Sequence, residues 1–173
     1  MTTAQYNQYL IIDTNIAKSY NDPARNDTSL DCLLLLNALQ DAACKVGVVT
    51  SPELETEWTE HASRAFNRWW ASMESRRRIR HIEDRRVADY RRAISKVEDE
   101  GIRTAMEKDA FIVELVILNW FAVASRDDRQ RNYVVRLGAD YEVLRKIQWF
   151  NPSEDWQDWL RGGCVDSTVF QCN

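Results

Sequence analysis

The fold of this chain is indicated by the stretch YLIIDTN over residues 9–15. Four apolar residues are followed at once by polar ones, which is typical of a buried strand of a parallel sheet that ends just before Asp13. A second apolar run at 46–49 is followed shortly by Ser51 and Pro52, a good helix N-cap and a good first helical residue. The sequence therefore predicts buried strands whose carboxyl ends lead into polar residues or helices.

Strands and helices alternate along the rest of the chain. The spacing of leucines predicts a helix over 30–43, and a largely apolar stretch predicts another over 106–119. Two further strands are expected at 120–124 and 146–150, with a short helix over 132–137 between them. Such alternation is typical of a three-layer α/β/α sandwich with a mainly parallel central sheet.

Positive charge is concentrated in one part of a chain whose net charge is −4. Between Arg64 and Arg92, ten arginines stand against four acidic residues, a local net charge of +6 that leaves −10 for the rest. Helical patterning without any proline from 53 to 98 predicts two long helices that turn between Ser72 and Asp84. The sequence therefore predicts a long helical basic arm at about 64–103.

The arginines of this arm are candidates for nucleic-acid contact, because arginine binds phosphate whatever the base sequence. The alternative is that they pair with the interleaved acidic residues along an exposed helix. The surplus of positive charge favours nucleic acid. The residues chosen for this role are Arg76, Arg77, Arg78, Arg80, Arg85 and Arg86.

Cysteine spacing and hydropathy exclude several classes of protein. The four cysteines form no CxxC pair and have no His at ligand spacing, so we expect reduced thiols and neither a zinc site nor a disulfide framework. The longest apolar stretch, 110–124, is interrupted by Glu114 and Asn119 and is too short to span a bilayer. With no signal-peptide pattern at the N-terminus, a cytoplasmic protein without membrane association is expected.

Acidic residues recur where the predicted strands end. Asp13 follows the first strand, and Asp127 and Asp128 follow a later one. Asp109 lies near the start of the helix that leads into that later strand, and Glu57 lies about one and a half turns into the helix after the second strand. Sites in open parallel sheets form outside the carboxyl ends of the strands, so these side chains are expected to converge.

Several carboxylates in one cleft favour a bound cation. Two unit charges about 4 Å apart repel each other by about 4 kcal/mol at an effective dielectric constant of 20. A divalent cation removes this repulsion, and carboxylate oxygens favour Mg²⁺ or Mn²⁺ over zinc. Such a metal lowers the pKa of bound water and stabilises the negative charge of a phosphodiester transition state. The sequence therefore predicts metal-dependent phosphodiester hydrolysis.

Five short segments follow one another in a recognisable order. They are Ile-Ile-Asp13-Thr14-Asn15, Ser51-Pro52…Glu57, Lys108-Asp109, Ala124-Ser125-Arg126-Asp127 and Phe150-Asn151-Pro152. Together they resemble the PIN-domain nucleases, a family that includes toxin-type ribonucleases. The resemblance covers roughly residues 8–152. It implies a five-stranded parallel sheet in the order 3-2-1-4-5, a nuclease domain over 1–152 and a C-terminal tail over 153–173.

The resemblance also implies a role for each acidic residue. The catalytic residues would be Asp13, Glu57, Asp109 and Asp127, and the ligands of Mg²⁺ or Mn²⁺ would be Asp13, Asp109, Asp127 and Asp128. Asn15 and Ser125 would orient these carboxylates. Members of the family often carry a second acid two residues after the Asp127 position, where this chain has Arg129 with Asp128 beside it.

The function that the resemblance implies is endoribonuclease activity on single-stranded RNA. Further partners that it implies are an antitoxin protein, seated in the acidic cleft of a toxin, and a second copy of the chain in a homodimer. The long segment 64–103 departs from the compact toxin members. Two alternatives therefore stand beside the ribonuclease: the toxin of a toxin–antitoxin pair, and a non-catalytic RNA- or protein-binding domain.

Overall fold

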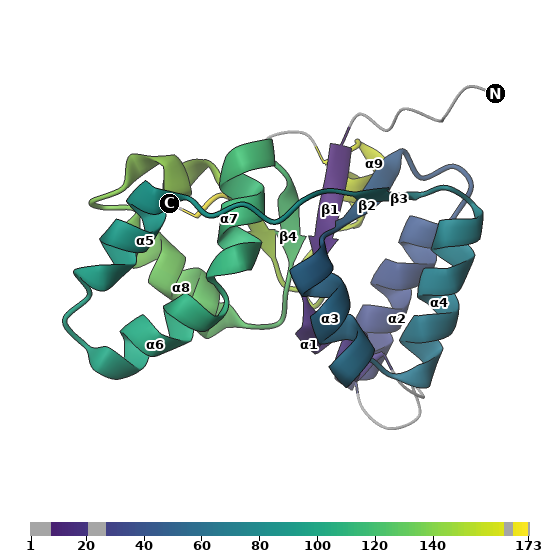
Figure 1. Cartoon of the computed structure of the whole chain (residues 1–173). Coiled ribbons are helices and arrows are strands. Elements are labelled where there is room, and N and C mark those ends of the chain that lie inside the picture. The colour runs from purple at the N-terminus through teal and green to yellow at the C-terminus, as the bar shows by residue number, and fades with distance from the viewer. Residues whose placement is uncertain (1–7, 21–26, 165–167, 173) are drawn as a thin grey trace.

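A parallel five-stranded sheet organises the molecule (Figure 1). The computed structural model describes residues 8–20, 27–164 and 168–172. Each neighbouring pair of strands is parallel, and the order is β3-β2-β1-β4-β5. The strands are β1 (Gln8–Ile12), β2 (Val46–Thr50), β3 (Ile79–His81), β4 (Ala122–Ala124) and β5 (Gln148–Phe150). The α/β class and the strand order 3-2-1-4-5 are thereby confirmed.

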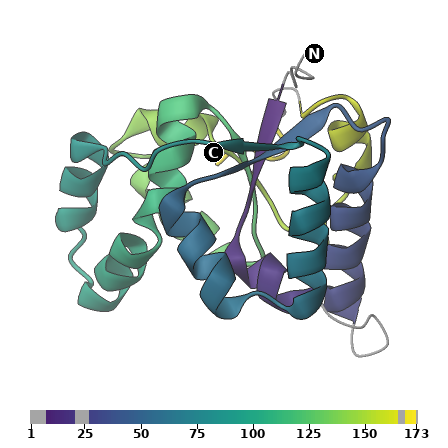
Figure 2. The same ribbon diagram turned by 45° about the vertical axis from the view of Figure 1, so that its right-hand side comes forward.

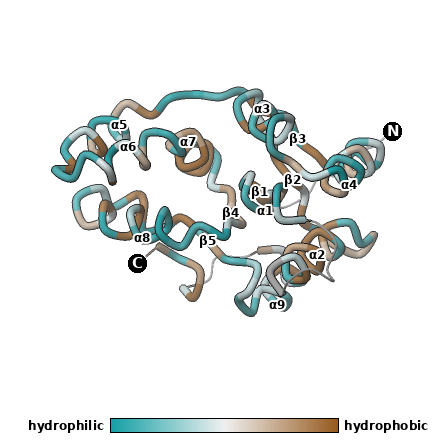
Figure 3. The backbone as a smooth tube through the Cα atoms, turned by 90° about the horizontal axis from the view of Figure 1, so that it is seen from below, coloured by the Kyte–Doolittle hydropathy of each residue, from teal (hydrophilic) through white to brown (hydrophobic). Residues whose placement is uncertain are grey.

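Helices flank the sheet on both sides, as the view from below shows (Figure 3). They are α1 (Thr14–Ser19), α2 (Asp27–Gln40), α3 (Pro52–His61), α4 (Arg64–Ser75), α5 (Ala88–Ser95), α6 (Glu100–Lys108), α7 (Ala110–Asn119), α8 (Asp128–Leu137) and α9 (Gln157–Arg161), with a 3-10 turn, η2, at Glu142–Lys146. None of the helices in the described part of the chain is long and apolar enough to cross a membrane.

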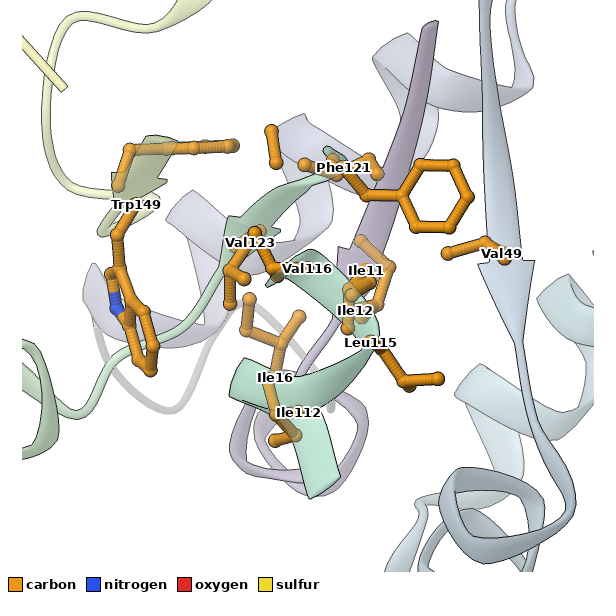
Figure 4. Packing of buried hydrophobic residues seen from close by; sticks show 14 of the residues in the cluster. Ile11, Ile12, Ile16, Val49, Ile112, Leu115, Val116, Phe121, Val123 and Trp149 are labelled. Carbon is orange, nitrogen blue, oxygen red and sulfur yellow. The ribbon is translucent and has the colours of Figure 1, made fainter. Parts of the chain in front are cut away.

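The core lies where α7 packs against the central strands. Ile11 and Ile12 of β1 lie close to Leu115 and Val116 of α7 (Figure 4), and all four are buried. Seven of the ten residues of α7, from Ala110 to Val116, are buried. Burial of large aliphatic side chains stabilises the fold by about 1.5–3 kcal/mol each. The helix that begins directly after Asp109 is therefore held firmly against the sheet.

The prediction of two long helices in the basic segment was wrong, because an edge strand lies inside it. Helix α4 ends at Ser75, and β3 then pairs with β2 through the register Val48↔Ile79. α4 lies beside α2 (Figure 2), where the indole N–H of Trp69 donates to the carbonyl of Leu36. The first half of the predicted arm is thus part of the sandwich, and α5 and α6 follow as two short helices.

Several residues of the segment 153–173, expected to be a C-terminal tail, are buried against the core. Trp159 and Phe170 both make edge-on contacts with Phe150, at centroid distances of 5.1 and 5.8 Å. A bridge between Gln148 and Gln171 adds an antiparallel partner to β5. The cysteines are free, as the sequence predicted: Cys32, Cys44, Cys164 and Cys172.

Candidate active site at the carboxyl end of the sheet

The two central strands end side by side. β1 and β4 pair in parallel register, with Ile12 opposite Ala124. The ladder continues one step further, because the backbone N–H of Asp13 donates to the carbonyl of Ala124 at 3.0 Å. Asp13 and Ser125 therefore leave adjacent strands at the same level. We call this end of the molecule the carboxyl end of the sheet, and the opposite end the amino end.

Asp13 is held by two polar side chains. The hydroxyl of Ser125 donates to Asp13 Oδ2 at 2.5 Å, and the amide of Asn15 donates to the same oxygen at 2.8 Å. The Asn15 amide also reaches Ser125 Oγ at 3.0 Å. Asp13 Oδ1 accepts no side-chain hydrogen bond from the residues that the structure describes. Asn15 and Ser125 thus fix the carboxylate, and the backbone of Asn15 also hydrogen-bonds to it.

The same network positions Asp127. Its backbone N–H donates to Ser125 Oγ at 3.0 Å, and its own Oδ1 caps α8 by accepting from the N–H of Gln130 at 3.0 Å. Ser125 is fully buried, and its hydroxyl contacts Asp13, Asn15 and Asp127. The N-cap of α8 and the end of β1 are therefore tied together through one hydroxyl.

Glu57 and Asp109 approach from the two sides. Glu57 lies on α3, and the indole N–H of the next residue, Trp58, donates to the carbonyl of Ile12 at 3.1 Å. This bond seats α3 against the last residue of β1. Asp109 lies at the corner where α6 ends and α7 begins, directly before the buried helix.

The charges of Asp109 and Asp127 act on Asp13, and the charges of Asp127 and Glu57 act on Asp109. Burial raises the pKa of Asp13 to about 6; the Ser125 hydrogen bond opposes this, and the charges of Asp109 and Asp127 add to it. Burial also raises the pKa of Asp109, against the effect of Lys108, and Asp127 and Glu57 raise it further. The four catalytic residues expected from the sequence are thus brought together at one end of the sheet.

The donor set suits a hard cation, although the side chains are not closed around one. In the described part of the chain, no three His, Cys, Asp or Glu side chains already stand as a metal-binding group. The charges of Asp109 and Asp127 raise the pKa of Asp13, so a divalent cation would relieve this repulsion. Oxygen ligands of this kind match Mg²⁺ or Mn²⁺. The residues that would hold it are Asp13, Asp109 and Asp127.

Asp128, expected as a fourth ligand, is turned to a different place. Its two carboxylate oxygens each lie 3.3 Å from the side-chain amide of Asn151, which follows β5. It is not among the charges that raise the pKa of Asp13 or Asp109. The reason is local: Asp128 is the first residue of α8, and Asp127 takes the N-cap position beside Ser125.

Four of the six arginines chosen for nucleic acid lie away from this site. Arg76, Arg77 and Arg78 follow α4 and precede β3, which places them at the amino end of the sheet. Arg78 is only 5% exposed, and its guanidinium donates to the carbonyls of Asp41 and Cys44. Arg80 reaches back over the ring of Tyr9, 5.3 Å from its centroid. The buried position of Arg78 favours a structural role, whereas Arg76, Arg77 and Arg80 are exposed.

The other two, Arg85 and Arg86, lie on an extended strap. Residues 82–87 cross from β3 to α5 in front of the sheet (Figure 1). The strap is held at both ends: Asp84 accepts from the backbone N–H of Glu53 at 2.8 Å, and the N–H of Val87 donates to Glu114 at 3.0 Å. Arg85 and Arg86 are exposed on it.

Basic residues that the sequence analysis did not choose lie at the carboxyl end. α4 begins there, because the N–H of Ser63 donates to the carbonyl of Ala17 in α1 at 3.1 Å. Arg68, one turn into α4, lies close enough to Tyr20 to lower its pKa against the effect of burial. Arg126 donates to Ser19. The exposed basic residues of this group are Lys18, Arg64, Arg68, Lys108 and Arg126.

Comparison with known proteins adds no family. No protein-family model matches the sequence, and the search of curated proteins returns no significant match. Function is therefore inferred from the residues that the fold brings together.

Proposed function

We propose that this chain is a Mg²⁺- or Mn²⁺-dependent endoribonuclease of the PIN-like type that hydrolyses phosphodiester bonds of single-stranded RNA. The observation that carries the proposal is the half-buried Asp13 carboxylate at the end of β1, held by Asn15 and Ser125, with Asp109 and Asp127 close enough to raise its pKa. A concentration of negative charge at this point of an open parallel sheet is costly without a cation.

Each side chain has a defined task in this proposal. Asp13, Asp109 and Asp127 hold the metal, and Asn15 and Ser125 keep the Asp13 carboxylate in place. When bound, the metal supplies a water of lowered pKa and stabilises charge on the phosphodiester. Glu57, whose only ion-pair partner among the described residues is His61 at 3.8 Å, is available to accept a proton from the attacking water.

The surrounding charge supports an anionic polymer as substrate. Arg64, Arg68 and Arg126 are exposed at the carboxyl end, around the acidic residues. Arginine and lysine at such positions bind phosphates without reading the bases. Single-stranded RNA offers a flexible backbone that can present one phosphodiester to the carboxylates while its neighbours meet the arginines.

The first test is thermal stability with and without Mn²⁺, measured on the native chain and on Asp13→Asn. Metal that binds only to the folded state stabilises the chain and so raises its melting temperature. At a metal concentration 100 times the dissociation constant, the gain in stability is about 2.7 kcal/mol. We expect a rise in the native chain that disappears in Asp13→Asn. A gel assay on unstructured RNA then follows, with cleavage expected only in the native chain with metal.

A second candidate function is a non-catalytic RNA-binding domain. It is favoured by the finding that no three candidate ligands in the described part of the chain already form a metal-binding group. RNA binding that is equal in native and Asp13→Asn chains, with no Mn²⁺ effect on melting in either, would support this candidate and exclude the nuclease.

A further inference from the structure

A small polar pocket lies beside the acidic residues, outside the carboxyl ends of β4 and β5. Its volume is about 260 Å³. The lining residues are Asp31, Cys32, Arg126, Asp128, Asn151, Pro152 and Ser153. They come from α2, from the two residues around the start of α8 and from the turn after β5. The pocket is smaller than the 300–1,000 Å³ of typical small-molecule sites, so it fits a single ring system.

One short chain of hydrogen bonds joins this pocket to the candidate active site. The backbone N–H of Arg126 donates to Asn15 Oδ1 at 3.0 Å, and the Asn15 amide donates to Asp13 at 2.8 Å. Arg126 therefore lies between the pocket and the candidate active site. A polymer whose phosphodiester lies at Asp13 would bring an adjacent nucleotide to the pocket.

The charged groups of the pocket are two carboxylates, from Asp31 and Asp128, and one guanidinium, from Arg126, which also donates to Ser19. The contacts of Asp128 with the Asn151 amide are long, at 3.3 Å. With two carboxylates and one guanidinium the lining is negative on balance, which disfavours a phosphate group inside the pocket and favours an N–H donor. Burial raises the pKa of Cys32 to about 11, so the side of the pocket formed by α2 gains no charge from this thiol at neutral pH.

We infer that this pocket binds the base of the nucleotide next to the scissile phosphodiester and selects a base with an exocyclic amino group. The inference rests on the proposed ribonuclease function. Carboxylates accept hydrogen bonds from amino groups such as N4 of cytosine. Single-stranded bases are read on such edges by side chains. Uracil carries a carbonyl at the same place and would face the carboxylates with an acceptor.

Asp128→Asn tests the inference, because asparagine keeps the size of the side chain and removes its charge. The matched control is Asp155→Asn, which alters an exposed aspartate nearby that does not line the pocket. The substrates are RNA oligonucleotides that carry cytosine or uracil at one position beside a single cleavage site. We expect the native chain and the control to prefer cytosine by about tenfold in kcat/KM, and Asp128→Asn to lose most of this preference.

A second measurement separates this inference from the proposed function. Binding of the nucleosides cytidine and uridine is followed by NMR, without metal and without cleavage. Cytidine binding that weakens in Asp128→Asn supports the pocket even if the chain cleaves nothing, a result that would remove the ribonuclease alone. Cleavage that is indifferent to the base, or equal preference in native and Asp128→Asn chains, would overturn the pocket and leave the ribonuclease standing.

Discussion

Charged side chains lie at both ends of the sheet, but the groups that surround them differ. At the amino end, Arg78 is buried and gives its guanidinium to the carbonyls of Asp41 and Cys44 in the turn before β2. At the carboxyl end, Asp13 is half-buried beside other carboxylates, and its pKa rises to about 6. A charged side chain with backbone hydrogen-bond partners stabilises the fold, whereas a charged side chain beside like charges favours the binding of a counter-ion.

A substitution at Asp13 tests this difference between the two ends most directly. We expect Asp13→Asn to lower the turnover of RNA at least about 100-fold, a rise of about 2.7 kcal/mol in the barrier, because a metal-binding carboxylate becomes neutral. The control is Asp41→Asn, an exposed aspartate at the amino end that should cleave as the native chain does. A comparable loss in Asp41→Asn would show that the two ends do not differ in function.

The amino end should respond in stability. Arg78→Met leaves two carbonyls without their charged donor, and each such hydrogen bond contributes about 1.5–3 kcal/mol. We expect the free energy of unfolding in urea to fall by about 3–6 kcal/mol, with cleavage per folded molecule unchanged. Arg85→Ala, which removes an arginine that is 72% exposed, should leave stability almost unchanged. An unaltered urea midpoint in Arg78→Met would contradict the structural role.

The raised pKa of Asp13 also predicts a pH dependence. This pKa is about 6 in the folded chain against 3.8 when exposed, so the folded state binds more protons than the unfolded state between these values. Stability in metal-free buffer should therefore fall as pH rises from 4 to 7, by at most about 3 kcal/mol. In Asp13→Asn, stability should depend much less on pH over this range. An equally steep fall in the variant would show that other groups cause the pH dependence.

The smallest expected effect is a difference in RNA affinity between two double variants, each of which removes a pair of arginines. Arg64→Ala/Arg68→Ala acts at the carboxyl end, and Arg76→Ala/Arg77→Ala removes the same charge at the amino end. The salt slope of binding to single-stranded RNA should fall by about 0.7 for each phosphate that the variant no longer binds. We expect a several-fold weaker affinity in the first pair and little change in the second, by fluorescence anisotropy in EDTA. The reverse ranking would place RNA binding at the amino end.

The carboxyl end could be predicted from sequence because its rule is local. Asp13 and Ser125 each come directly after an apolar run, and a parallel sheet carries such residues to one end. The orientation of Asp128 followed no such rule, since it depends on which of two adjacent aspartates caps α8. That choice is made by the contact of Asp127 with Ser125, and either aspartate would suit the pattern.

At the amino end, strand β3 and the buried position of Arg78 were not predicted, because neither leaves a trace in the sequence pattern. β3 is three residues long and two of them are Arg80 and His81, so it shows neither alternation nor an apolar run. The partners of Arg78 are carbonyls 34 and 37 residues earlier, which no residue type identifies. A run of arginines therefore resembled an exposed surface, although one of its members is part of the interior.

The bond between Trp58 and the carbonyl of Ile12 gives the molecule an intrinsic fluorescent probe. The Trp58 side chain is fully buried and is bonded to the residue that precedes Asp13, so its emission should respond to a change at the end of β1. Trp120 is 52% exposed and is open to a collisional quencher such as acrylamide. In the presence of the quencher, the remaining tryptophan emission comes mainly from buried indoles. Metal or nucleotide binding beside Asp13 can therefore be followed without a label.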